Sequence, residues 1–298
     1  MNPLELINVQ SLMDISSGSK DISIGIIDGP VDLNHPDLKE FNIKTVNDSQ
    51  QRLCKQPIDG SFLHGTFIVG ILTGKRGSKT AAICPKCKII LCPIFKYTNK
   101  NKNHHNNNYY NNFLGTTPKE LADAIVEVVD AGAKIINLSL QVSSSSIVKY
   151  SELKEAYNYA LQKEVIIVAA AGNQAIMGYS SIIDHPWLIP VVSCDSAGNL
   201  DWSSNISPSI AKRGLMAPGV NITSTVPGGQ YGEISGGTSI ATAFVTGAIA
   251  LLWSIFPKTR VSDLISSVIT PSIPMPRSIV PKLLNTHISY AILGKIFL

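Results

Sequence analysis

The amino-acid sequence predicts an α/β fold, with a doubly wound, mostly parallel β-sheet flanked by helices on both faces. Continuous apolar runs of strand length alternate along the chain with stretches whose apolar residues recur every three or four positions, which is the helical spacing. Strands that are apolar throughout are typical of parallel sheets covered on both sides by helices. The chain has 298 residues, 44% of them hydrophobic, and is long enough to bury such a core.

The expected elements follow one another in strand–helix order. The strands are the unbroken apolar runs at 22–28, 88–95, 134–140, 165–172 and 187–194. Helices are expected at 64–74, at 118–133, where Gly132 would end the helix, at 151–164, and over the long uncharged stretch that follows Ser239. No linker, repeat or change in composition interrupts this alternation. We therefore expect one domain over 20–298, an N-terminal extension over 1–20, and an Asn-rich low-complexity loop over 97–115 near the binding crevice.

Composition and charge exclude several classes of partner. Charged residues make up 15% of the chain and the net charge is +4, without the Lys/Arg block that nucleic-acid or membrane binding would need. The N-terminus lacks the basic start and apolar run of a secretory signal. No segment has the uninterrupted apolar length of a membrane span. We expect no nucleic-acid partner, no membrane partner and a cytoplasmic location.

The five cysteines favour a reducing compartment, because their number is odd and their density low. Cys84 and Cys87 form a CPKC motif, which could indicate a zinc site or a redox pair. Zinc would need a fourth ligand, and only Cys92 lies nearby in sequence. A redox pair is expected at a helix start, whereas this motif leads into a strand. Incidental cysteines are favoured, and a local disulfide or a metal site remains open.

Four polar residues stand at the ends of predicted strands or the starts of predicted helices. Asp28 ends a strand and Asn173 follows one, while His64 and Ser239 each open a helix. Taken singly, each has a structural reading as a cap or turn former. Together they supply a nucleophile, a base, an acid that orients the base, and an N–H donor for an oxyanion. The order Asp, His, Ser is one of those in which this set occurs, and the alternative GxSxG motif is absent around Ser239.

Several segments, taken together and in order, resemble the subtilisin-like serine proteases (subtilases). They cover about residues 20–290 and read IGIIDGPVDLNHPDL, HGTFIVGIL, NLSL, VAAAGN, MAPG and GGTSIATAFVTGAIALL. VPKLLN (280–285) resembles the start of the last helix in that family. A finer resemblance, in DGPVDLNHPDL, CPKCKIILCPIF and MAPGVNITSTVPGG, is to the proteases that process ribosomal peptide precursors in cyanobactin (patellamide-type) pathways.

The resemblance implies a serine endopeptidase that works through an acyl-enzyme and needs no cofactor for catalysis. It assigns the triad to Asp28, His64 and Ser239, and the oxyanion donor to Asn173. It also implies a set of substrate-binding residues along an edge strand and a pocket wall: Ser139, Leu140, Gln141, Ala171 and Gly172. The implied partner is a peptide or precursor peptide, and the oligomeric state stays open. Structural calcium also stays open, because the segment after the predicted His64 helix lacks the acid- and Asn-rich loop of many relatives.

Departures from the family pattern keep two alternatives in view. An additional glycine precedes Thr238, and Ala243 stands where the family usually has proline. These changes motivate a catalytically impaired subtilase fold that binds peptides. A transpeptidase or macrocyclase is the least favoured reading. Macrocyclising relatives carry a water-excluding insertion between the acid and the histidine, and the short separation of Asp28 and His64 leaves little room for it.

Overall fold

The computed structural model describes residues 1–46, 60–94, 116–140, 151–178, 183–269 and 278–297. Its main sheet has seven strands, all parallel, and a separate antiparallel pair completes the β-structure of the described residues. The strands are β1 (Ser23–Asp28), β2 (Ile43–Thr45), β3 (Lys88–Pro93), β4 (Ile135–Leu138), β5 (Ile166–Ala170), β6 (Leu188–Cys194), β7 (Leu215–Pro218), β8 (Ile222–Val226) and β9 (Gln230–Ile234). The predicted α/β fold with a parallel sheet is confirmed.

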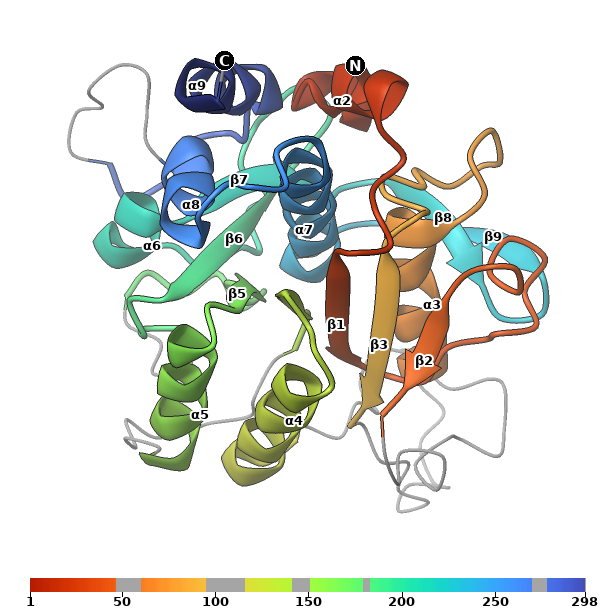
Figure 1. The fold of residues 1–298 in the computed structure, drawn as a ribbon, viewed down its shortest axis with the longest axis horizontal. Helices are drawn as coiled ribbons and strands as arrows, with labels where there is room; N and C mark the ends of the chain where they lie inside the picture. The colour runs from red at the N-terminus through yellow and green to blue at the C-terminus, as the bar shows by residue number, and fades with distance from the viewer. Residues whose placement is uncertain (47–59, 95–115, 141–150, 179–182, 270–277, 298) are drawn as a thin grey trace.

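The order of strands in the main sheet is β2-β3-β1-β4-β5-β6-β7 (Figure 1). From β1 the chain goes to β2 at one edge and returns to β3, which lies between them; it then crosses to β4 on the other side of β1 and continues outward to β7. The winding direction therefore reverses around β1 and β4. In open α/β sheets, ligands bind outside the carboxyl ends of the strands at such a reversal. Asp28 ends β1, and Ser139 follows β4.

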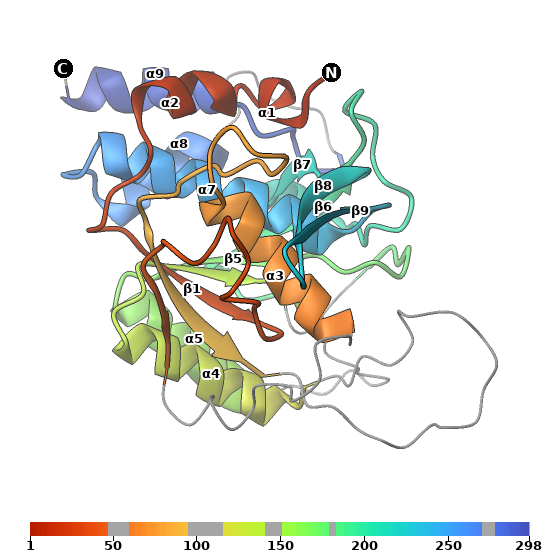
Figure 2. The ribbon, with the colours of Figure 1, turned by 90° about the vertical axis from the view of Figure 1, so that its right-hand side faces the viewer.

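Helices form a layer on each side of the main sheet (Figure 2). Helices α4 and α5 lie against one face, while α3 and α7 lie against the other, with α8, α9 and the N-terminal helices beyond them. The helices are α1 (Pro3–Leu6), α2 (Val9–Ile15), α3 (Gly60–Thr73), α4 (Pro118–Asp130), α5 (Ser151–Gln162), α6 (Pro208–Arg213), α7 (Thr238–Ile255), α8 (Val261–Ile269) and α9 (Thr286–Phe297). Two apolar clusters fill the space between sheet and helices, one on each face.

Helix α7 is apolar all round because it is enclosed on every side. The sheet lies on one side of it, and α2, α8 and α9 lie on the other. Within the described residues it is the one helix with the length and hydropathy of a membrane span, and 89% of that stretch is buried inside the protein. A helix that is hydrophobic around its whole circumference is either buried in a core or spans a membrane, and the burial identifies α7 as a core helix.

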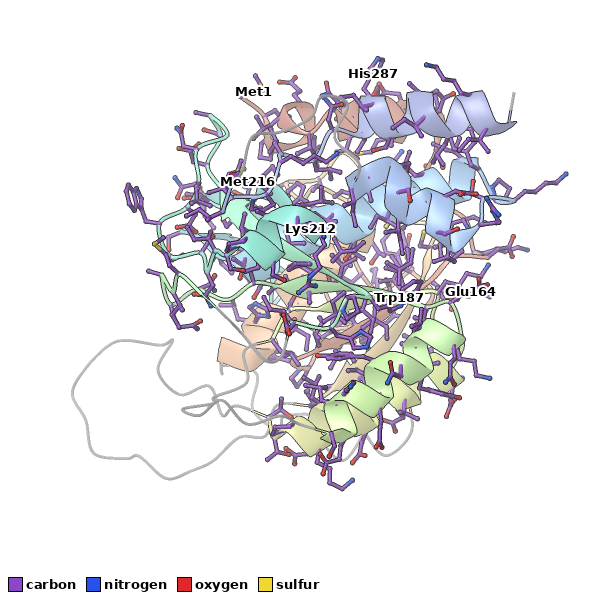
Figure 3. All side chains as sticks on the ribbon, turned by 90° about the vertical axis from the view of Figure 1, so that its left-hand side faces the viewer. Met1, Glu164, Trp187, Lys212, Met216 and His287 are labelled. Carbon is purple, nitrogen blue, oxygen red and sulfur yellow. The ribbon has the colours of Figure 1, made fainter. Side chains whose placement is uncertain are left out.

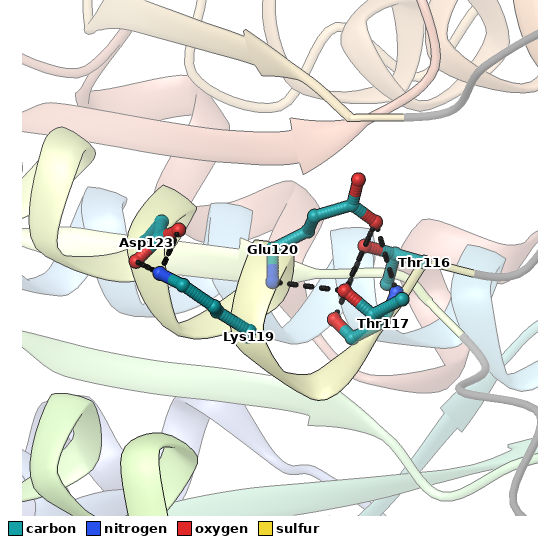
Figure 4. Close-up of polar contacts among 5 residues, drawn as sticks. All are labelled: Thr116, Thr117, Lys119, Glu120 and Asp123. Atoms are coloured by element: carbon teal, nitrogen blue, oxygen red, sulfur yellow. Dashed lines mark hydrogen bonds and ion pairs between the residues drawn. The ribbon is translucent and has the colours of Figure 1, made fainter.

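Local sequence signals fix the helix starts on the opposite face. Thr117 caps α4: its hydroxyl accepts from the Glu120 backbone N–H at 3.2 Å, and the Glu120 carboxylate accepts from the Thr117 N–H at 3.1 Å (Figure 4). This reciprocal pair satisfies two backbone donors that a helix start leaves open.

Trp187, labelled in Figure 3, donates its indole N–H to the Val165 carbonyl at 2.6 Å and ties the chain before β6 to the start of β5.

The first fifteen residues pack onto the domain. Ile7 and Val9 are fully buried in the same apolar cluster as α7. The Ile7 carbonyl accepts from both the backbone N–H and the hydroxyl of Thr286, at 3.0 and 3.1 Å, at the start of α9. The two chain ends are thereby joined through α2 and α9, which lie side by side in both ribbon views. The predicted Asn-rich loop, 97–115, lies entirely outside the described residues.

Candidate active site

Asp28 and His64 form a buried carboxylate–imidazole pair. The Asp28 side chain is fully buried at the end of β1, and its Oδ1 lies 2.7 Å from His64 Nδ1. The same oxygen accepts from the Gly29 backbone N–H at 2.6 Å. Among the described residues Oδ2 is buried and has no hydrogen-bond partner. Nδ1 donates to the carboxylate, which fixes the tautomer of the imidazole.

The environment of His64 raises the pKa of its imidazole. Burial acts to lower the pKa, but the charge of Asp28 and the hydrogen bond to it act in the opposite direction and prevail. The His64 side chain keeps 18% of its surface exposed. It is therefore held by a buried acid on one side and remains accessible from solvent on the other. That combination suits a group that exchanges protons with a bound molecule.

Two close approaches position the helix that carries His64. A side chain at Gly65 would place its Cβ 2.4 Å from the Gly29 carbonyl oxygen, so only glycine lets α3 come this near the loop after β1. On its other side α3 contacts β8, where the Thr225 hydroxyl donates to the Thr66 carbonyl at 2.8 Å. Gly70 allows this contact, because a Cβ there would overlap Thr225. Strand β8 was not among the predicted elements, although it holds α3 in place.

Ser239 lies in the first turn of α7 and is partly exposed. Its hydroxyl donates to the Ser139 carbonyl at 3.4 Å, and its own carbonyl accepts from the Ser139 hydroxyl at 3.1 Å. The end of β4 is thus joined to the start of α7. Gly237 precedes this turn with φ +156°, a conformation that L side chains rarely adopt. The positive end of the helix dipole faces the serine.

The Asn173 side chain is exposed, and its amide is oriented by the residue before the serine. Its Oδ1 accepts from the Thr238 backbone N–H at 2.9 Å and from the Thr238 hydroxyl at 2.8 Å. The amide nitrogen is therefore turned away from Thr238 and lies 3.5 Å from the point where a Cβ on Gly237 would stand. Thr238 also accepts from the Gly172 N–H at 3.2 Å. Thr238 was not among the predicted site residues, although its position directly before Ser239 could have indicated a supporting role.

The predicted substrate-binding residues fall into three situations. Ser139 and Leu140 are buried directly after β4, and Gln141 lies outside the described residues. Ala171 is buried and Gly172 has φ +103°. The turn that contains Ala171 and Gly172 is held by Asn205, which the sequence analysis missed. The Asn205 amide donates to the Ala171 carbonyl at 3.1 Å and accepts from the backbone N–H groups of the following loop at 3.0 and 3.1 Å.

Hydrogen bonds therefore join the predicted site residues into two sets. Asp28 and His64 form one set at the ends of β1 and α3. Ser139, Gly172, Asn173 and Ser239 form the other, around the start of α7. The contacts that unite the second set run between residues 65 or more positions apart in sequence. The first set holds an acid–base pair, and the second holds a hydroxyl and an N–H donor.

The segment after α3 does not fit a calcium ion. Arg76 in this segment donates to the carbonyls of Met13, Ser16, Ala82 and Ile83 and to the hydroxyl of Ser17. A guanidinium thus stands among carbonyl oxygens of the kind that calcium prefers, and its positive charge would repel the ion. Among the described residues no group of three or more His, Cys, Asp and Glu side chains is placed to hold a metal ion.

The cysteines of the CPKC motif are free, buried thiols. Cys84 and Cys87, together with Cys92 and Cys194, are not joined in disulfides. The turn they form lies against the N-terminal segment: the Lys86 N–H donates to the Ser17 carbonyl at 2.8 Å. A side chain at Gly18 would meet the Cys87 sulfur at 2.7 Å. The motif therefore packs the N-terminal segment against the start of β3.

Comparisons with known proteins agree with this arrangement. The chain is 31% identical over 243 residues to the thermophilic serine proteinase of Bacillus sp. (strain AK1), covering 81% of this chain and 54% of that protein. It thus spans about half the length of this relative.

Solved structures of two maturation proteases share the fold. The self-cleaved protease domain of PatA matches with a TM-score of 0.77 and 27% identity, over 94% of this chain and 98% of that one. The prenylagaramide maturation protease PagA matches in fold with a TM-score of 0.79 and 24% identity, over 96% and 98%. The sequence pattern of the subtilase family matches residues 19–285. The chain belongs to the subtilase family.

Proposed function

We propose that this chain is a serine endopeptidase that cleaves peptide bonds through an acyl-enzyme on Ser239. The observation that carries the proposal is the buried Asp28–His64 pair, at 2.7 Å, in a subtilase domain whose α7 starts with a partly exposed serine. A serine hydroxyl is a poor nucleophile on its own. It becomes effective beside a base whose tautomer is fixed by an acid.

The reaction follows from the roles of these groups. Ser239 Oγ attacks the scissile carbonyl and passes its proton to His64 Nε2. His64 then protonates the leaving amine, and afterwards activates the water that hydrolyses the acyl-enzyme. Asp28 keeps the Nδ1 proton in place and stabilises the imidazolium that forms. The raised pKa of His64 makes it a stronger base than a free imidazole.

The tetrahedral intermediate needs donors for its oxyanion. Asn173 Nδ2 and the backbone N–H of Ser239 would provide them. Thr238 supports this role because it binds Asn173 Oδ1 twice and so fixes the direction of the amide nitrogen. In subtilisin, a member of the same family, loss of the oxyanion asparagine lowers turnover by about 10²–10³.

We infer that the substrate is a peptide that lies extended along the backbone of Ser139 and Leu140. Gln141, which lies outside the described residues, is proposed as a further substrate-binding residue. An added strand of this kind gains affinity from main-chain hydrogen bonds, and pockets for side chains give it specificity. Ala171 and Gly172 would form the wall of the pocket for the residue before the cut. The likeness to PatA and PagA supports a finer proposal, that the substrate is a ribosomal peptide precursor.

The test is cleavage of a peptide library by the purified chain, with products identified by mass spectrometry. Ser239→Ala should abolish cleavage. Ser235→Ala is the matched control, because Ser235 is exposed in the same loop, and it should cleave at the wild-type rate. Equal cleavage by the Ser239 variant would contradict the proposal.

One observation favours a second function, a peptide-binding module with little turnover. The Ser239 hydroxyl donates to the Ser139 carbonyl, and the additional Gly236 gives the preceding loop more freedom. Under this alternative the folded wild-type protein binds library peptides but releases no products. Saturable binding without cleavage would favour the binding module over the peptidase.

A further inference from the structure

An asparagine is buried in the middle of the sheet, between apolar neighbours. Asn137 is fully buried in β4, where it pairs with Ile26 of β1 and Val168 of β5. A buried amide is costly unless its donors and acceptor are used. Its Oδ1 accepts from the Thr246 hydroxyl at 2.9 Å, and its Nδ2 donates to the Ser139 hydroxyl at 2.7 Å. None of these contacts belongs to the Asp28–His64 pair.

The chain of hydrogen bonds continues from Asn137 to the nucleophile. The Ser139 hydroxyl, having accepted from Asn137, donates to the Ser239 carbonyl at 3.1 Å. The bonds thus run from Thr246 in the third turn of α7, through β4, and back to the first turn of α7. We refer to Thr246, Asn137 and Ser139 as the strand–helix link.

The periodicities of strand and helix bring these side chains to one interface. Ile135 packs in the cluster on the α7 side of the sheet, while Ile136 and Leu138 pack on the other side, so Asn137 and Ser139 face α7. Ser239 and Thr246 are seven residues apart, which is two turns on the same face and about 10.5 Å along the axis. Positions 137 and 139 are roughly 6.6 Å apart along the strand, and hydrogen bonds tie them to these two turns of α7.

The protons of the link leave one arrangement. The Ser139 hydroxyl donates to Ser239, so it must accept from the amide nitrogen, which places Oδ1 against Thr246. Reversing the amide would put N–H groups against the Thr246 hydroxyl, and the single Ser139 hydroxyl proton could then bond either Asn137 Oδ1 or the Ser239 carbonyl but not both. Each broken bond would leave a buried group unsatisfied, at about 1–3 kcal/mol. A buried network in which each side-chain nitrogen and oxygen has a partner is rigid, whereas apolar side chains at 137 and 246 would fill the space without these directional bonds.

We propose that Asn137 and Thr246 are positioning residues that hold the peptide-binding edge at Ser139 in a fixed place relative to Ser239. This inference rests on the proposed endopeptidase function, in which the substrate backbone lies along Ser139. Neither residue touches the substrate. They act on the distance between the bound carbonyl and Ser239 Oγ, and a displacement of about 1 Å at this point can cost 10²-fold in rate.

The test compares two reactions of one variant. Thr246→Val replaces the hydroxyl with a methyl group of similar size and leaves Asn137 Oδ1 without its donor. A fluorophosphonate reagent needs the activated serine but not the peptide edge, whereas a peptide substrate needs both. We expect peptide kcat/KM to fall about 10- to 100-fold, mainly in kcat. The rate of Ser239 labelling should stay within about threefold of wild type, and the pH dependence of labelling should be unchanged.

Two further variants separate positioning from general destabilisation. Thr246→Ser keeps the donor and should restore peptide cleavage to within about threefold of wild type. Thr73→Val is the matched control: Thr73 is buried in α3 and its hydroxyl donates only to the Val69 carbonyl of the same helix. It should leave the ratio of peptide cleavage to labelling unchanged, even if its melting temperature falls.

Each outcome decides between the possibilities. A folded Thr246→Val protein with the wild-type ratio of peptide cleavage to labelling overturns the inference, as does a serine variant that fails to restore cleavage. If Thr246→Val does not fold, Thr246→Ala removes the same donor without adding a methyl group in its place, and it should show the same loss of peptide cleavage with labelling retained. Wild-type protein that neither cleaves peptides nor labels would instead refute the proposed function.

Discussion

The replacement of Asp28 by asparagine separates a catalytic carboxylate from a structural one. The carboxylate is fully buried, and its Oδ1 bonds both His64 Nδ1 and the Gly29 N–H. Asp28→Asn keeps the shape but removes the charge, and its N–H₂ group can turn the imidazole to the wrong tautomer. If the pair served only the fold, the loss would be that of one hydrogen bond, about 1 kcal/mol or less than tenfold in rate. If Asp28 orients a catalytic base, turnover falls by about 10⁴, which is about 5.5 kcal/mol of transition-state stabilisation.

The assay is peptide cleavage across pH, normalised to correctly folded protein by circular dichroism. Activity requires neutral His64, so it falls as pH drops below the pKa of that group. Asp28 is what raises this pKa against the effect of burial, so the residual activity of the variant should persist to lower pH than that of wild type. Asp37→Asn is the matched control, because Asp37 is a buried carboxylate that accepts from Tyr231 at 2.8 Å. A folded Asp28 variant within tenfold of wild type would refute the catalytic assignment.

Two other predictions follow from the described contacts. Asn173→Leu should lower kcat by about 10²–10³ with little change in KM, because the amide is used only when the oxyanion forms. Steady-state kinetics measure both constants. A rise in KM as large as the fall expected in kcat would indicate a role in substrate binding instead. Arg76→Met should lower the free energy of unfolding by about 3 kcal/mol, measured by urea denaturation, because it strands the carbonyls of Met13 and Ile83; added calcium should not restore it, and restoration would contradict the account of this segment.

Five of the seven strands of the main sheet and the polar residues at its edge could be predicted because both depend on local patterns. The runs around β1, β3, β4, β5 and β6 are apolar on both faces, and a parallel strand between two helical layers has that composition. Asp28 and Asn173 were recognisable because each breaks an apolar run where the strand ends. The predicted helix at 64–74 begins earlier in the structure, at Gly60. The prediction rested on the apolar spacing after His64 and did not use Asp59, which directly precedes Gly60 in sequence and is of a type favoured before helix starts.

The missing elements are those whose stability comes from distant contacts. Strands β8 and β9 pair only with each other, and β8 is held to α3 by hydroxyl groups, so neither shows the apolar run of a buried strand. The N-terminal helices are short, and Arg76 fixes the segment after them from about 60 positions away. Residues 1–20 contain few apolar side chains, and the buried ones among them, such as Ile7 and Val9, pack in the same cluster as α7.

The supporting residues of the site were missed for the same reason. Thr246 and Asn137 are 109 positions apart, and each looks ordinary in its own segment, a threonine in a helix and an asparagine near a strand end. Asn205 holds the turn at Ala171 from 34 positions away. A single sequence carries no sign of such pairings, whereas the reacting groups themselves carry a chemical signature. The proposed nucleophile, base and acid could therefore be named before their surroundings were known.

The most direct measurement of the central claim is fluorophosphonate labelling of the intact protein, read by mass spectrometry and mapped to the modified residue. Native protein, heat-unfolded protein and the Ser239→Ala variant are treated side by side. We expect one adduct, on Ser239, in the native protein alone, because only the folded chain brings Asp28 and His64 together to activate this serine. No adduct in a sample shown to be folded, or equal labelling after unfolding, would contradict it.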